Sequence, residues 1–194
     1  MHHVIIGNGP AGVVAAETLR KIAPHDQVTI IGREKTAPYS RMAIPYFIAG
    51  KIAEQGTHLR KTDGHFDALG ITQLQATVRG IDAQARQLTL DEGSMLSFDR
   101  LLIATGSSPV QPPIAGMDTP NVVACWTLDD ARRICESVTP GTRVLLMGAG
   151  FVGCIIIAPL LKRGAHVSLV ASGDRMVPRM MTEGAGKMLQ RWVQ

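Results

Sequence analysis

The chain has 194 residues, of which 45% are hydrophobic, which is enough to build a buried core and excludes a disordered protein. Its net charge of +4 comes from scattered basic residues, so a small anionic ligand is favoured over nucleic acid. The three cysteines, Cys125, Cys135 and Cys154, form no CxxC pair. Their spacing argues against a zinc site or a disulfide framework and favours a cytoplasmic protein.

Two apolar stretches raise the question of a membrane. Residues 144–161 carry no charge, but three glycines interrupt them, and the pattern predicts a strand, a glycine turn and a buried helix rather than a membrane span. No basic residue precedes the apolar run at the N-terminus, so a signal peptide is not expected.

Residues 4–32 read as an apolar strand, the motif Gly7-x-Gly9-x-x-Gly12, an apolar helix with a basic end, and a second strand at 28–31. This order predicts a βαβ unit. In such a unit the first glycine permits a tight turn, the second lets a pyrophosphate approach the backbone, and the third lets helix and strand pack closely. Glu34 follows 22 residues after Gly12, where an acid can accept hydrogen bonds from adenosine ribose hydroxyls; the alternative is a solvated loop acid.

Residues 71–106 predict a small β-meander, with a turn at 80–82, followed by a buried strand that ends in Ala104-Thr105-Gly106. Three small residues at a strand end allow a ligand or another backbone to approach. Residues 107–120 contain four prolines and predict a linker. Thr127 then predicts the N-cap of a helix with acids in its first turn.

The unit at 4–32 recurs at 145–171, where Gly148, Gly150 and Gly153 repeat the first three glycines with a shift of 141 residues. Two copies in the same context predict two dinucleotide sites, whereas one copy alone is weak evidence. The second copy has no acid at its strand end unless Asp174 supplies one. Pro159 falls inside its helix, where it costs about 3 kcal/mol or a kink.

The order GNGPAG, LLIATGSSP, a proline-rich linker and GAGFVG resembles the FAD-dependent pyridine nucleotide-disulfide oxidoreductase superfamily over essentially the whole chain. The resemblance implies an α/β fold of two Rossmann-like dinucleotide-binding units with a small β-meander. It implies an FAD-binding domain at 1–110 and an NAD(P)-binding domain at 111–194. The residues that it assigns to FAD are Gly7, Gly9, Pro10, Ala11 and Gly12 for the pyrophosphate, Glu34 for the ribose, the Val78 backbone for adenine, and Ala104, Thr105 and Gly106 against the cofactor. It assigns Gly148, Gly150 and Gly153 to NAD(P)H.

Residues 38–51, PYSRMAIPYFIAGK, resemble the flavin-side segment of the NADH oxidase and coenzyme A-disulfide reductase branch and of assimilatory nitrite reductases. This implies that Arg41 contacts FAD phosphate or ribose; the alternative is a solvated arginine. Met42 stands where that branch has a redox cysteine. The implied function is hydride transfer from NAD(P)H to flavin and onward to a small-molecule or redox-protein acceptor without a redox cysteine. The alternative is a non-catalytic FAD- or ADP-binding module. No catalytic side chain and no metal site are expected.

Members of the family run to roughly twice this length, so the resemblance covers an N-terminal half. We therefore expect a truncated second unit and a fragment with little activity alone. An open strand edge predicts that residues from about 144 are mobile or are covered by another copy of the chain in a homo-oligomer. Ile155 and Ala171 replace acids that the family often has, and Arg175 lies four residues beyond the strand, so neither NADH nor NADPH is favoured.

Overall fold

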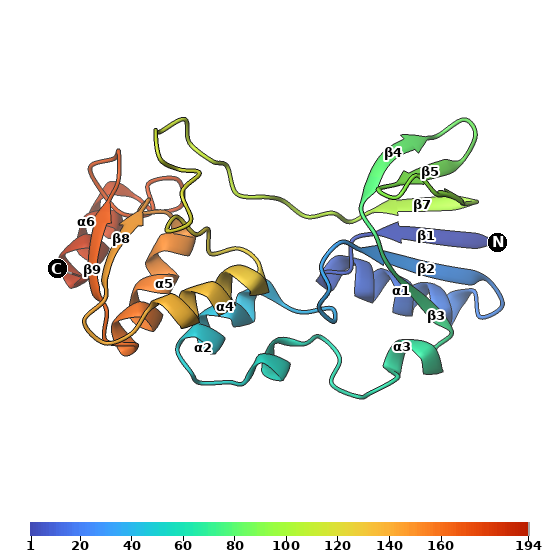
Figure 1. The fold of residues 1–194 in the computed structure, drawn as a ribbon, viewed down its shortest axis with the longest axis horizontal. Coiled ribbons are helices and arrows are strands. Elements are labelled where there is room, and N and C mark those ends of the chain that lie inside the picture. The colour runs from blue at the N-terminus through green and yellow to red at the C-terminus, as the bar shows by residue number, and fades with distance from the viewer. Residues whose placement is uncertain (194) are drawn as a thin grey trace. The chain divides into compact units, whose positions relative to one another are not determined.

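The computed structural model describes residues 1–193, which form two compact units. The first unit comprises Met1–Ser40 and Gln55–Ser108, and the second comprises Arg41–Glu54 and Pro109–Gln194. Both contain parallel strands joined by helices (Figure 1), which confirms the predicted α/β class.

A parallel sheet with the strand order β3-β2-β1-β7 forms the centre of the first unit (Figure 1). A second, antiparallel sheet has the order β4-β5-β6. The elements of this unit are β1 (His2–Ile6), α1 (Pro10–Ile22), β2 (Gln27–Gly32), η2 (Glu54–Thr57, whose first residue belongs to the second unit), α3 (His65–Ala68), β3 (Ile71–Gln75), β4 (Val78–Asp82), β5 (Gln87–Leu90), β6 (Met95–Ser97) and β7 (Arg100–Ile103).

The central strands of this sheet are apolar on both faces, as expected for a parallel sheet covered on both sides. Ile5 and Ile30 pack with Val13 of α1 on one face. Val4 and Ile31 pack with Leu88 of β5 on the other face. Helix α1 and the antiparallel sheet therefore cover opposite faces, and the carboxyl ends of the parallel strands remain at one edge.

Two details of the predicted meander are wrong. The turn expected at 80–82 is part of strand β4, and the turn lies at 83–86. The reason is the carboxylate of Asp82, which accepts hydrogen bonds from the backbone N–H groups of Gln84 and Ala85 and so begins the turn at its own position. Residues 71–75 form a strand as predicted, but it joins the parallel sheet beside β2 instead of the meander.

The strand expected to be buried at 101–106 is also different in the structure. It forms β7, an edge strand that pairs with β1 alone among the described residues. Leu102 is 42% exposed and Ile103 is 59% exposed. The apolar run at 101–103, which suggested a buried strand, therefore forms an edge strand of the sheet.

The second unit contains η1 (Arg41–Ala43), α2 (Ile44–Ile48), α4 (Leu128–Ser137), β8 (Arg143–Met147), α5 (Phe151–Lys162), β9 (His166–Val170) and α6 (Glu183–Val193). Strands β8 and β9 pair in parallel, and α5 connects them, as the second βαβ prediction requires. Helix α5 continues through Pro159. Thr127 caps α4 as predicted, because its hydroxyl accepts from the Asp130 N–H while the Asp130 carboxylate accepts from the Thr127 N–H.

Residues 41–54 pack with the second unit although they precede most of the first unit in sequence. Ile44 and Ile48 of α2 are buried. The guanidinium of Arg132 donates to both carboxylate oxygens of Glu54 at 2.6 and 2.9 Å. The guanidinium of Arg163 donates to the backbone oxygens of Ile48, Cys135 and Val138. The division into a flavin domain and a nicotinamide domain at residue 110 stays a prediction.

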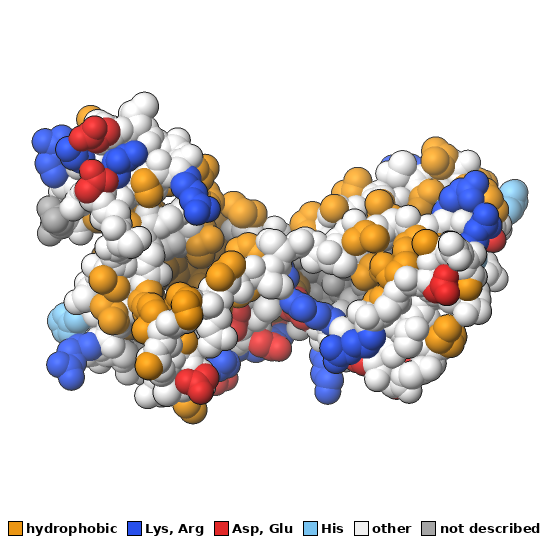
Figure 2. Space-filling model, turned by 90° about the horizontal axis from the view of Figure 1, so that it is seen from above, with side chains coloured by type: hydrophobic (Ala, Val, Ile, Leu, Met, Phe, Trp, Pro, Cys, Tyr) orange, Lys and Arg blue, Asp and Glu red, His pale blue; other side chains and the backbone are white. Residues whose placement is uncertain are grey.

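Exposed hydrophobic side chains occur on both units (Figure 2). In the two-stranded sheet of the second unit, Leu145 is 64% exposed and Val170 is 47% exposed. Within residues 1–193, no helix combines the length and the hydropathy needed to cross a bilayer. The predicted mobility or self-association of the second unit stays a prediction.

Candidate functional site

The first glycine loop joins β1 to α1 at the carboxyl edge of the parallel sheet. Gly7 has φ +114°, which favours glycine, and its N–H donates to the Ile31 oxygen of β2 at 2.8 Å. On its other side the Ala104 N–H donates to the Ile6 oxygen at 2.8 Å. A Cβ on Gly7 would lie closer than 3.0 Å to the Ala104 oxygen. The structure thus brings the glycine loop and Ala104, predicted separately, into contact.

The three glycines of this loop have different physical reasons to be glycine. A Cβ on Gly12 would clash with the Gly7 oxygen, so Gly12 is required for close packing of helix on strand. Gly9 has an ordinary φ of −75°, and no protein atom lies within 4 Å of the position that its Cβ would take. Neither backbone conformation nor packing within the described residues requires glycine at position 9.

Helix α1 begins at Pro10, directly after Gly9, with Ala11 next to it. Its N-cap residue, Gly9, provides no side-chain cap, and no acid lies in the first turn. Helix α5 also begins without a side-chain cap or an acid. Helix α4, which follows no glycine loop, has Thr127 as its cap and two acids in the first turn. The two glycine-loop helices therefore present N–H groups and a positive dipole end that suit an external anion.

Glu34 lies two residues beyond the end of β2. At the end of that strand a Cβ on Gly32 would clash with the side chain of Asn8, so the loop and the strand end are in close contact. The Glu34 carboxylate accepts a hydrogen bond of 2.6 Å from the hydroxyl of Tyr39. We did not predict roles for Asn8 or Tyr39 from sequence. Tyr39 lies within the flavin-like segment 38–51, but nothing in its spacing indicated that it contacts Glu34.

The remaining residues predicted to contact FAD lie in different places. Thr105 follows Ala104 beside Gly7, and Gly106 has φ +69°. Val78 begins β4, just after the end of β3 and therefore near the sheet edge that carries Glu34, since the Ala76 N–H donates to the Gly32 oxygen at 3.1 Å. Arg41 belongs to the second unit, where its guanidinium lies 5.0 Å from the centroid of the Trp126 ring.

The second glycine loop repeats this geometry. Gly148 has φ +102°, and its N–H donates to the Val170 oxygen at 2.7 Å. A Cβ on Gly153 would clash with the Gly148 oxygen, as at Gly12. Gly150 has φ −79° and no protein atom within 4 Å of a Cβ, as at Gly9. The middle glycine is again the one whose identity the described protein atoms do not require.

The segment after β9 packs against the second glycine loop. The Val177 N–H donates to the Ala149 oxygen at 2.7 Å, and both residues are buried. Asp174, considered as a late ribose acid, is an exposed side chain that pairs with Arg175 at 3.2 Å. No acid stands at the strand end itself, where Ala171 lies. The second unit therefore lacks a counterpart of the Glu34–Tyr39 pair among residues 171–175.

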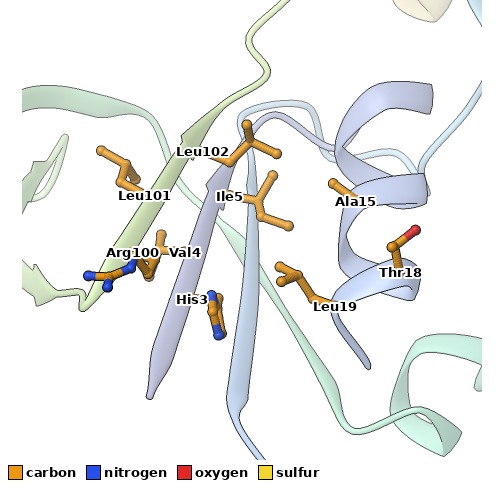
Figure 3. A pocket seen from close by; sticks show the side chains of 9 residues that line it. All are labelled: His3, Val4, Ile5, Ala15, Thr18, Leu19, Arg100, Leu101 and Leu102. Carbon is orange, nitrogen blue, oxygen red and sulfur yellow. The ribbon is translucent and has the colours of Figure 1, made fainter. Parts of the chain in front are cut away.

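Each unit contains a cavity among its described residues. One, of about 370 Å³, opens between α1 and the strands β1 and β7 (Figure 3). It is mainly apolar and none of its lining residues is a predicted site residue; they are His3, Val4, Ile5, Ala15, Thr18, Leu19, Arg100, Leu101 and Leu102. The other, of about 470 Å³, lies in the second unit and extends from Leu161 of α5 to Ala171, Gly173 and Arg175 beyond β9.

All three cysteines are free thiols in the second unit. Burial raises the pKa of Cys125 to about 11, helped by the charge of Asp130. Burial also raises the pKa of Cys135 and of Cys154. A thiolate is the reactive form of cysteine, so these side chains are poor nucleophiles at neutral pH.

The chain is similar in sequence to known reductases and oxidases. It is 31% identical to the benzene 1,2-dioxygenase system ferredoxin–NAD(+) reductase subunit of Pseudomonas putida, over 97% of this chain and 46% of that protein. It is 28% identical to the NADH oxidase of Methanocaldococcus jannaschii, over 100% of this chain and 45% of that protein. The chain thus spans about half the length of the curated relatives it matches.

Solved structures of reductases are also similar to the chain, again over about half or less of their own length. The chain is similar to putidaredoxin reductase in its covalent complex with putidaredoxin, with a TM-score of 0.92, 27% identity, and coverage of 98% of this chain and 47% of that one. A NAD-dependent persulfide reductase from A. fulgidus matches with a TM-score of 0.91 and 25% identity, over 100% of this chain and 38% of that one. A family profile described as pyridine nucleotide-disulphide oxidoreductase matches residues 1–194. The chain belongs to the pyridine nucleotide-disulphide oxidoreductase family.

Proposed function

We propose that the protein is an FAD-dependent NAD(P)H oxidoreductase in which the first unit holds FAD and the second holds NAD(P)H. The observation that carries the proposal is the repeated glycine loop. In each copy, backbone conformation or protein contacts explain why the first and third positions are glycine, but they do not explain the middle glycine, Gly9 or Gly150. The uncapped, acid-free starts of α1 and α5 fit a pyrophosphate at the same two places.

Each residue at the first site would have a separate task. The backbone from Gly7 to Gly12 would hold the pyrophosphate, and Glu34 would accept hydrogen bonds from the adenosine ribose. The position of Val78 near the same sheet edge supports a backbone contact with adenine. Ala104 and its neighbours would lie along the cofactor. Bound FAD would supply hydride acceptance from NAD(P)H and electron transfer to an acceptor, while the protein binds and orients both nucleotides.

Arg41 remains proposed as a contact with FAD phosphate or ribose. An arginine suits a phosphate because its guanidinium can donate two parallel hydrogen bonds.

We propose that electrons leave the flavin without a cysteine relay. Met42 cannot form a disulfide, and the three thiols of the chain have raised pKa values. Relatives named ferredoxin–NAD(+) reductases make a small iron–sulfur protein the first acceptor to test. Free thiols throughout also support the cytoplasmic location inferred from the sequence.

The test is anaerobic reduction of the FAD-loaded protein by NADH and by NADPH, followed by the visible flavin absorbance. The proposal expects the absorbance near 450 nm, an approximate flavin band, to bleach and to return when a redox-protein acceptor is added. Flavin that binds but stays oxidised with both nucleotides would instead identify the alternative, a non-catalytic FAD- or ADP-binding module.

A further inference from the structure

Tyr39 and Glu34 form a short hydrogen-bonded pair at the carboxyl edge of the parallel sheet. The Tyr39 hydroxyl donates to Glu34 Oε2 at 2.6 Å. The tyrosine is only 7% exposed, whereas the glutamate is half-buried. A charge-assisted hydrogen bond from a buried donor restricts the rotamers of the carboxylate that accepts it.

The backbone around Tyr39 is itself fixed by a segment distant in sequence. Tyr39 forms an antiparallel bridge with His58. The Leu59 N–H donates to the Pro38 oxygen at 2.8 Å, and the Ser40 N–H donates to the Thr57 oxygen at 2.9 Å. Residues on both sides of Tyr39 are therefore tied to 57–59, and the phenol is held in place before any ligand arrives.

The pair lies where an adenosine ribose is expected. Glu34 follows β2 by two residues, and the end of that strand contacts Asn8 of the glycine loop. A carboxylate has about four lone-pair directions, so it can accept from Tyr39 and from ribose hydroxyls at the same time. A carboxylate that is already oriented loses less conformational entropy when it accepts those bonds.

We propose that Tyr39 is a positioning residue for the ribose-binding carboxylate Glu34, an inference that rests on the proposed FAD site in the first unit. It acts through Glu34 rather than by touching the cofactor. The contribution of Tyr39 to nucleotide affinity should therefore be larger for a nucleotide that carries both ribose hydroxyls than for one that lacks a hydroxyl. A tyrosine with only a structural role would affect both nucleotides equally.

The experiment compares the parent chain with Tyr39→Phe, which removes only the hydroxyl. FAD affinity is measured by fluorescence titration, and ADP and 2′-deoxy-ADP are measured as competitors of FAD so that only the flavin site is reported. Because the variant loses the orientation of the carboxylate and keeps the carboxylate itself, we expect a roughly fivefold weaker affinity for FAD and for ADP. The affinity for 2′-deoxy-ADP, which keeps only the 3′-hydroxyl, should fall less, so that the preference for ADP over 2′-deoxy-ADP becomes smaller in Tyr39→Phe.

Tyr46 provides the matched control because it is the other tyrosine of the chain and is 54% exposed in α2. Tyr46→Phe should leave both affinities unchanged. A preference for ADP that is the same in Tyr39→Phe and in the parent would overturn the role of Tyr39 while leaving the FAD site intact. A parent protein that binds no FAD would overturn the proposed function and this inference together.

A second measurement covers the case in which Tyr39→Phe does not fold. Placing 3,5-difluorotyrosine at position 39 keeps the ring and makes the phenol more acidic than that of tyrosine, and phenolate absorbance reports the pH at which it ionises. Ionisation then removes the proton of the hydrogen bond to Glu34, so the ADP affinity of this variant relative to that of the parent should fall as the pH rises through that ionisation. Equal pH dependence of the two proteins would contradict the proposal.

Discussion

Gly7 and Ala104 are so close that a Cβ on Gly7 would clash with the Ala104 carbonyl oxygen. This contact joins the end of β1 to the end of β7, two strands separated by almost the whole first unit in sequence. It means that the first glycine of the loop is needed by the fold itself. Gly9, two residues later, has no such contact.

The two glycines should therefore respond differently to alanine. Gly7→Ala combines a steric clash with a positive φ and should destabilise the first unit by about 3 kcal/mol or more. Gly9→Ala should change the unfolding free energy by less than about 0.5 kcal/mol, because its φ is ordinary and the space beside it is open. Urea unfolding followed by circular dichroism checks both, and equal destabilisation of the two variants would contradict the division of roles.

Gly150 should be important for nicotinamide nucleotides only. Gly150→Val puts a branched side chain where the second pyrophosphate is proposed, in a backbone conformation that valine adopts readily. We expect reduction of bound flavin by NADH and NADPH to be lost while the FAD affinity and the melting temperature stay at parent values. Unimpaired reduction in this variant would remove Gly150 from the nucleotide site.

The raised thiol pKa values predict slow alkylation. With its pKa near 11, only about one thousandth of Cys125 is thiolate at pH 8. Iodoacetamide labelling, followed residue by residue with mass spectrometry, should be far slower at Cys125 than for free cysteine and should speed up toward pH 11. Flavin reduction should survive complete alkylation; loss of activity in proportion to labelling would support a thiol relay after all.

Glu17 should make the stability of the first unit dependent on pH. The guanidinium of Arg60, which donates to both of its oxygens, and the ring of His65 hold the pKa of Glu17 below its ordinary value of 4.5. The carboxylate therefore stabilises the folded state fully above pH 4.5, and this contribution disappears as the pH falls through the lowered pKa.

Glu17→Gln should accordingly lower the free energy of unfolding by about 1 kcal/mol at pH 7. This gap in stability between variant and parent should narrow below pH 4.5. Thermal unfolding at several pH values measures this gap. The control is Asp63→Asn, which changes an exposed carboxylate of the same unit. A gap at pH 7 no larger than that of the control would contradict the assigned role of the Glu17 cluster.

The parts predicted correctly from sequence were those with a local cause. Two glycine loops between apolar strands and helices require particular backbone geometry, and Thr127 followed by Asp130 makes a cap from residues three apart. The small size of Ala104 predicted that something approaches it closely, and in the structure that neighbour is Gly7.

The parts predicted wrongly or missed depend on distant contacts. The glycine at position 80 suggested a turn, but pairing of β4 with β5 keeps it in a strand. The position of Arg41 in the second unit follows from burial of Ile44 and Ile48 in α2, which packs against α4 and α5, helices that come about eighty or more residues later in the chain. The bond between Tyr39 and Glu34 depends on anchoring by 57–59, which no local pattern indicates.

The most direct test of the central claim is an FAD titration of the parent chain beside Gly9→Val, with the melting temperature of both proteins recorded. The account predicts saturable FAD binding by the parent, no binding by Gly9→Val, and equal melting temperatures without flavin. FAD binding by Gly9→Val as tight as that of the parent would contradict it, because the open space beside Gly9 would then not be where the pyrophosphate lies.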